Sequence, residues 1–184
     1  MRRWQLGLIG VAALSVLLAS WLRNERGAAT EPLVLNAGPD YYMTDFVLYV
    51  SDARGRPAYR LQAERFAHLA ADDTGELVKP EFTLQQPAGP PWVMRAEDGW
   101  IGPQGAELYL IGGVTMVRTR SEDEPAIRIT TEDLRVRPKD RVASTDLTVV
   151  ATSGPHRLQG VGMFADLARE RMQLLADVTG RYVP

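Results

Sequence analysis

The chain has 184 residues, a formal net charge of -2 and no cysteine. This charge balance provides no basic field to neutralise a phosphate backbone, so nucleic acid is not an expected partner. The lack of cysteine excludes disulfides and an acylated cysteine after an export signal. Roughly 150 residues follow Thr30, which is enough for one domain with its own core.

The first feature in chain order is an uncharged apolar run over residues 6–22. Counted from Trp4 at about 1.5 Å per residue, it covers roughly 28 Å, close to the hydrocarbon thickness of a bilayer. Arg2 and Arg3 precede it, which predicts a single-pass anchor with a cytoplasmic N-terminus. A cleaved signal peptide is the alternative, but the nearest small-residue site lies beyond a charged tetrapeptide. The expected anchor residues are Leu6, Leu8, Leu14, Leu17, Leu18 and Trp21.

The chain is therefore expected to have three parts. Residues 1–23 form a cytoplasmic stub and anchor, residues 24–39 a tether, and residues 40–184 an exported β domain. Small residues dominate the tether, and Pro32 and Pro39 interrupt it, so it holds the domain close to the membrane.

Beyond Asp40 the apolar pattern has period two, and Gly, Pro and Asp recur at intervals of about 8 to 12 residues. This pattern predicts an all-β domain of short strands separated by turns, one of them at Gly112 and Gly113. Residues 165–175 could form a helix, but the alternation continues through Val178 and favours strand, turn and strand. The expected strands are 44–51, 58–66, 81–86, 92–96, 107–111, 114–120, 126–131, 134–137, 142–144, 147–151, 156–160, 162–167 and 172–178, with residues 180–183 finishing the last one.

Parity along these strands predicts one inward, apolar face. These residues could fill a sandwich core or line a partly empty groove, because acyl chains and apolar side chains need the same surface. Parity does not separate the two readings. The candidate lining residues are Phe46, Leu48, Leu61, Phe82, Leu84, Trp92, Met94, Leu110, Ile129, Leu147, Met163, Met172, Leu174, Val178 and Tyr182.

Three glycines are expected to have structural roles. Gly55 lies in the turn of the first hairpin, where a positive φ or extra room is needed. Gly160 and Gly162 predict a bulge that bends the sheet before its last strands.

The sequence contains no arrangement typical of an active site. His68 and His156 are far apart, and neither has the spacing of a metal motif. The acidic clusters at residues 72–73 and 122–124 lie among turn residues and are expected to be solvated loops. We therefore expect no enzyme activity, no metal and no cofactor.

Four segments, taken with the apolar run, resemble the LptC family, the bitopic inner-membrane component of the lipopolysaccharide export machinery. They are PDYYMTDFVLYVSDARGRPAYRLQAERFAHL (39–69), PPWVMRAEDGWIG (90–102), ITTEDLRV (129–136) and GVGMFADLARERMQLLADVTGRYVP (160–184). Each motif is short, but their order and spacing cover nearly the whole chain.

The resemblance implies a jellyroll-like, OstA/LptA-type open twisted β domain of two antiparallel sheets around a greasy groove. It implies the inner membrane of a Gram-negative bacterium, with the main domain in the periplasm. Family members receive lipopolysaccharide from the inner-membrane ABC transporter and pass it to an LptA-like bridge protein. The N-terminal edge near residues 41–51 and the transmembrane helix would meet the permease subunits. The C-terminal edge near residues 172–183 would meet the bridge protein.

Two other classes of function stay open. A membrane-tethered periplasmic scaffold could bind partner strands at its sheet edges without carrying lipid, since a filled core gives the same pattern. A cell-envelope hydrolase would need a polar cluster in a cleft.

Overall fold

The computed structural model describes residues 38–87, 89–120 and 125–182. The expected anchor and nearly all of the expected tether lie outside these residues. Among the residues described, no helix is both long enough and apolar enough to cross a bilayer. Residues Ala37–Pro184 form a unit of their own, and the following description concerns that unit alone.

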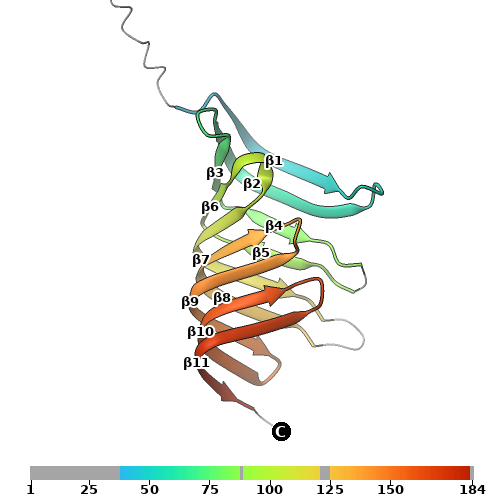
Figure 1. The fold of residues 1–184 in the computed structure, drawn as a ribbon, viewed down its shortest axis with the longest axis vertical. Helices are drawn as coiled ribbons and strands as arrows, with labels where there is room; N and C mark the ends of the chain where they lie inside the picture. Colours follow the sequence, from blue (N-terminus) through green and yellow to red (C-terminus); the bar gives the residue numbers. More distant parts are fainter. Residues whose placement is uncertain (1–37, 88, 121–124, 183–184) are drawn as a thin grey trace, which may run out of the picture. The chain divides into compact units, whose positions relative to one another are not determined.

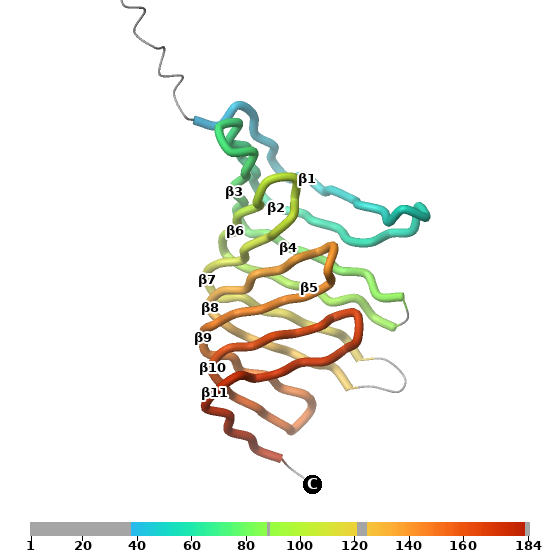
Figure 2. Tube along the Cα trace, in the orientation of Figure 1, coloured from blue at the N-terminus to red at the C-terminus, as the bar shows by residue number. Residues whose placement is uncertain are grey.

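The described residues contain eleven antiparallel strands and one short 3-10 helix, η2 (Figure 1). The chain runs through the strands in succession, from β1 in blue to β11 in dark red (Figure 2). The elements are β1 (Tyr41–Ser51), β2 (Pro57–Leu69), β3 (Thr74–Val78), β4 (Glu81–Leu84), β5 (Trp92–Arg95), β6 (Asp98–Ile101), η2 (Pro103–Gly105), β7 (Leu108–Arg118), β8 (Ile127–Arg137), β9 (Val142–Ser153), β10 (His156–Asp166) and β11 (Arg171–Arg181).

The strand pairings define two layers. The long strands β2 and β7 to β11 belong to both, because one half of each strand lies in layer I and the other half in layer II. Layer I contains β3, β6 and residues 65–69, 108–111, 133–137, 142–145, 163–166 and 171–174. Layer II contains β4, β5 and residues 59–62, 115–118, 127–130, 148–153, 156–161 and 176–181. The two expected sheets are therefore halves of one hydrogen-bonded sheet. Figure 1 shows the layers one behind the other.

The long strands pass from one layer to the other at bulges. Their register shifts between Ile111 and Val114 in β7 and on both sides of Val161 in β10. Gly112, Gly113 and Gly162 have positive φ angles of 79°, 67° and 74°. Bulges bend a strand and increase its twist, and glycine adopts a positive φ without a Cβ clash. The shifts in β10 fall at Gly160 and Gly162, where the sequence predicts a bulge.

Several expected strand boundaries are wrong. The expected turn at Gly112 and Gly113 lies inside the continuous strand β7, and β8, β9 and β10 are likewise each one strand instead of two. The strands β3 and β6 are absent from the prediction, and β3 begins directly after residues 72–73, which are expected to lie in a loop. The expectation of strand, turn and strand over residues 165–175 is confirmed by β10 and β11.

The hydrophobic core lies between the two layers and draws on both. Its fully buried members from layer I include Leu110, Leu134 and Met163. Its members from layer II include Leu84 and Met94. Inward residues alternate with outward ones along each half-strand, as the pleat requires. The apolar interior therefore runs continuously from β2 to β10.

Candidate functional site

Most of the expected lining residues face the interior between the layers. Those buried in the core are Leu61, Phe82, Leu84, Trp92, Met94, Leu110, Ile129 and Met163. Those half-buried and packed against this core are Phe46, Met172 and Leu174. The structure thus brings together, on one continuous surface, side chains that the sequence spreads over about 130 residues.

Four of the expected lining residues are exposed, and three of them lie away from the interior. Leu147 is 42% exposed because β9 is irregular there, and its N–H donates to Thr145 Oγ1 at 3.1 Å. Val178 is 54% exposed and follows Asp177, whose φ of 49° breaks the alternation of β11. Tyr182 is 77% exposed and stacks on His156 with ring centroids 4.6 Å apart. Strict parity therefore fails at Leu147 and Val178, where the register of a strand is irregular, and at Tyr182, which lies beyond the end of β11.

A cavity of about 360 Å³ opens at the β1 end of the interior. Leu48, the remaining expected lining residue, is exposed yet lines this cavity opposite Leu61, its partner in the register of β1 and β2. Phe66 also lines the cavity, and Gly75 lies so close to its ring that a Cβ on this glycine would clash. Phe82 and Leu108 complete the apolar wall from the two layers.

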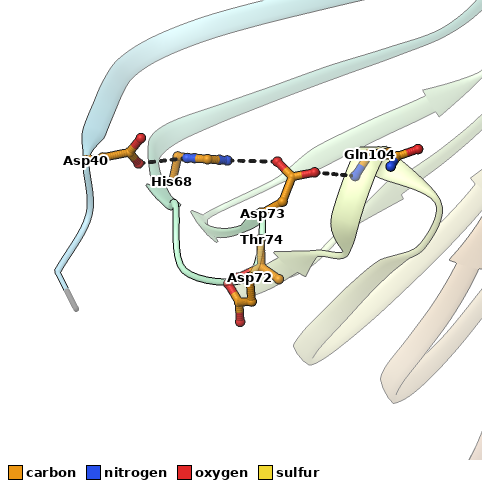
Figure 3. A network of polar contacts seen from close by, with 6 residues as sticks. All are labelled: Asp40, His68, Asp72, Asp73, Thr74 and Gln104. Carbon is orange, nitrogen blue, oxygen red and sulfur yellow. Dashed lines mark hydrogen bonds and ion pairs between the residues drawn. The ribbon is translucent and has the colours of Figure 1, made fainter.

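A polar network holds the rim of this cavity together (Figure 3). His68 Nδ1 lies 2.7 Å from Asp40 Oδ1, and His68 Nε2 lies 3.2 Å from Asp73 Oδ1. The backbone N–H of Gln104 donates to Asp73 Oδ2 at 3.2 Å, and the ring of Tyr41 stacks on His68. The network therefore ties the start of β1 to the end of β2, to the following turn and to η2.

The electrostatics of this network favour a charged imidazole. Hydrogen bonds to Asp40 and then to Asp73 raise the pKa of His68 above its ordinary value. The hydrogen bond from His68 lowers the pKa of the Asp40 carboxyl. The sequence does not predict this network, because its members are distant in the chain and follow no motif spacing.

The two outer strands leave backbone edges without a partner strand among the described residues. β1 pairs with β2 alone, and β11 pairs with β10 alone. Both carry exposed apolar side chains: Tyr42 and Tyr49 are 74% and 72% exposed, and Leu175 is 59% exposed. Unpaired edges of this kind are templates for pairing with a further strand.

The hairpin between β1 and β2 contains the third glycine expected to be structural. Gly55 has a φ of 77°, and its N–H donates to the carbonyl of Asp52 at 2.9 Å. Within the described ranges, no group of three or more His, Asp or Glu side chains could hold a metal ion.

These features define a class: an antiparallel β protein of two layers, with an apolar interior, a cavity at one end and two exposed edge strands. A family model described as lipopolysaccharide-assembly, LptC-related matches residues 8–183. The chain belongs to this family, which confirms the resemblance seen in the sequence.

A search of solved structures supports the fold. It matched the crystal structure of LptH, the LptA homologous periplasmic component of the conserved lipopolysaccharide transport device from Pseudomonas aeruginosa. The TM-score is 0.55 at 8% identity, and the match covers 68% of this chain and 95% of that one. At this identity the likeness concerns the fold alone. A search of curated proteins found no match.

Proposed function

We propose that this chain is a lipopolysaccharide-binding transport subunit. It receives lipopolysaccharide from an inner-membrane ABC transporter and passes it through its apolar interior to a periplasmic bridge protein of the same fold. The observation that supports this proposal is the continuous apolar interior between the layers, which opens into the cavity of about 360 Å³ beside β1. Membership of the LptC-related family supports this proposal.

The physical role of the interior follows from the cost of moving acyl chains through water. Each methylene transferred out of water contributes about 0.8 kcal/mol, so a lipid with several chains needs an unbroken apolar path. Leu61, Phe82 and Leu108 receive the chains at the open cavity, and Met94 and Met163 lie deeper along the path. Methionine suits such a path because its unbranched side chain adapts to irregular gaps.

The two edge strands bind the partner proteins. β1 pairs with a β domain of a permease subunit, and β11 pairs with the LptA-like bridge protein, so that the three interiors join end to end. Residues 1–23 anchor the chain in the inner membrane of a Gram-negative bacterium and contact the permease helices. The main domain, residues 40–184, lies in the periplasm as a jellyroll. The chain itself performs no chemistry, and ATP hydrolysis in the transporter gives the direction.

One observation favours a second function. The middle of the interior is filled, since Leu84, Met94, Leu110 and Met163 are all 0% exposed. A filled core with open edges also suits a scaffold that binds partner strands and carries no lipid. A carrier must instead separate its layers when an acyl chain enters, and the two functions therefore differ in whether lipid ever reaches the buried side chains.

Site-specific photocrosslinking distinguishes these functions. A photoreactive residue replaces Phe46, Leu84 or Met172, which face the interior, or Arg128 or Arg135, which are exposed. Membranes that contain the whole transport complex are supplied with ATP and lipopolysaccharide. The carrier predicts ATP-dependent crosslinks to lipopolysaccharide from the inward positions alone. Crosslinks to protein only, or an equal yield at the arginine controls, would reject it.

A further inference from the structure

Arg141 lies in the turn between β8 and β9. This turn is on the open side of the two layers, opposite the bulges at which the long strands pass from one layer to the other. The side chain of Arg141 leaves layer I and donates through Nη2 to the carbonyl of Gln85 and to Gln86 Oε1, which follow β4 of layer II. The backbone fixes this direction: Arg141 has a φ of 57°, and its carbonyl accepts from the N–H of Leu167 at 2.8 Å. A left-handed conformation is costly for a residue with a Cβ, and such strain is often kept at functional positions.

The charge of Arg141 is not balanced by a neighbouring carboxylate. The groups that accept from its guanidinium are a carbonyl and an amide oxygen, both neutral, and no ion pair to it occurs within the described residues. Arg60, Arg95 and Arg118 differ, since each forms an ion pair with a glutamate. Burial lowers the pKa of the Arg141 guanidinium, but an arginine stays protonated in proteins. A partly buried cation of this kind favours an anionic partner.

Further N–H groups surround Arg141. The Nε–H of Arg141 and the amide nitrogen of Gln86 are buried and have no hydrogen-bond partner among the residues that the structure describes. Both residues line a cavity of about 410 Å³, together with Arg56. The Arg56 guanidinium bonds to Asp52 at 2.8 Å. Two guanidinium groups and one carboxylate leave one net positive charge in this cavity.

The cavity borders the apolar interior. Gln85 directly follows Leu84, which is fully buried between the layers, and Ala58 directly precedes Tyr59, which packs on the core. A polar group bound in the cavity would therefore stay at the surface while an attached acyl chain reached inward. Planar guanidinium groups bind two oxygens of a phosphate at once, which gives them an advantage over other cations at such a site.

We propose that Arg141, Gln86 and Arg56 form a phosphate-binding site at the open side of the two layers, and that it holds a phosphate of the carried lipid's headgroup. The assignment to a lipid rests on the proposed function, whereas the phosphate site itself does not. Binding draws Arg56 away from Asp52 and supplies the countercharge that Arg141 lacks.

The test measures the affinity of the full chain, in nonionic detergent, for diphosphoryl lipid A and for the same lipid with its phosphates removed. The variant Arg141→Gln is compared with Arg128→Gln, which removes the same charge from an exposed position on β8. The wild type should prefer the phosphorylated lipid about tenfold, since hydrogen bonds to charged groups contribute that much. R141Q should bind both lipids equally, and R128Q should keep the preference. A preference retained in R141Q, or absent from the wild type, overturns the proposal.

Two further measurements test the phosphate site if R141Q does not fold or if the wild type binds neither lipid. Arg56→Gln alters a side chain that is 65% exposed, so it folds even if R141Q does not, and it should lower the preference about threefold. An unchanged preference in R56Q overturns the proposal. If the wild type binds neither lipid, the proposed function fails, and the thermal midpoint in inorganic phosphate decides the site. A rise in the wild type that R141Q lacks supports a phosphate site, and equal midpoints reject it.

Discussion

Three glycines lie at the bends of β7 and β10. A side chain there could cost stability in two ways, through backbone strain at a positive φ and through a steric clash of its Cβ, and the three positions differ in which of these applies. Gly113 has a φ of 67°, but a Cβ would meet nothing within 4 Å. Gly160 has no positive φ, but a Cβ would lie 3.1 Å from the carbonyl oxygen of Ala176. Gly162 has both features, with a φ of 74° and a Cβ position 3.1 Å from Leu175 Cδ1.

The expected losses of stability follow from these positions. Gly113→Ala should cost about 1 kcal/mol, the usual penalty for alanine at a positive φ. Gly160→Ala should cost about 1 to 2 kcal/mol, because a backbone carbonyl cannot move aside cheaply. Gly162→Ala should cost about 2 kcal/mol, roughly the sum of backbone strain and a tight contact. The contact with Leu175 accounts for the difference between G162A and G113A.

The assay is urea unfolding of the full chain in detergent, followed by far-ultraviolet circular dichroism. Each kcal/mol should also lower the thermal midpoint by about 3 to 5 °C for a domain of this size. Leu175→Ala in the G162A background should recover part of the loss, because it removes the contact with Cδ1 but keeps the backbone strain and the Cβ of residue 175, which lies 3.2 Å away. The reasoning is refuted if G113A and G162A cost the same, or if L175A restores nothing.

Three other predictions concern the rim, the core and an ion-pair cluster. Asp40 and Asp73 raise the pKa of His68, so the stability that this network gives the fold is complete below about pH 6.5 and is lost as pH rises through the raised pKa. His68→Gln should therefore make the urea midpoint depend less on pH between pH 5 and 9. An unchanged pH dependence would contradict this. Leu84→Ala, at a 0% exposed position, should cost about 2 to 5 kcal/mol in urea unfolding, whereas Leu175→Ala should cost less than about 1; equal losses would argue against this core. Glu81 accepts from Arg60 at 2.9 Å and from Arg95 at 2.6 Å, so Glu81→Gln should cost about 1 to 2 kcal/mol in the same assay. The exposed Glu64→Gln should cost about 0.5 kcal/mol or less. A larger loss in E64Q than in E81Q would refute the stabilising role of Glu81.

Period two in the sequence was sufficient to predict the all-β fold and most of the interior. It placed Phe82, Leu84, Trp92 and Met94 correctly, because their short strands contain no bulge. It failed at Leu147, because an irregularity inside β9 changes the phase while leaving the residue types unchanged.

Turns and bulges were the main source of error along the chain. Gly112 and Gly113 predict a turn, but a positive φ serves a bulge equally well, and here it bends β7 from one layer to the other. Only the pairing with β8 distinguishes the two, and pairing between strands is not a local property of the sequence. Residues that depend on such pairing, such as Leu77 on the unpredicted strand β3, were missed for the same reason.

The polar sites were not predictable from local patterns. His68 meets Asp40 across 28 residues, and Arg141 meets Gln85 across 56. Neither contact follows a motif, since each arises where the ends of distant strands come together. The apolar interior was predictable because many residues repeat one simple pattern, whereas each polar contact depends on a single pair.

Tryptophan quenching shows whether acyl chains enter the space between the layers. Trp92 is 5% exposed in the interior, whereas Trp100 packs against Tyr109 on the outer face of layer I. The full chain with Trp4, Trp21 and Trp100 replaced by Phe reports on Trp92 alone, and a matched variant retains only Trp100. Lipid A with brominated acyl chains should quench Trp92 and leave Trp100 unchanged. Equal quenching of both, or none at Trp92, would show that acyl chains do not enter between the layers.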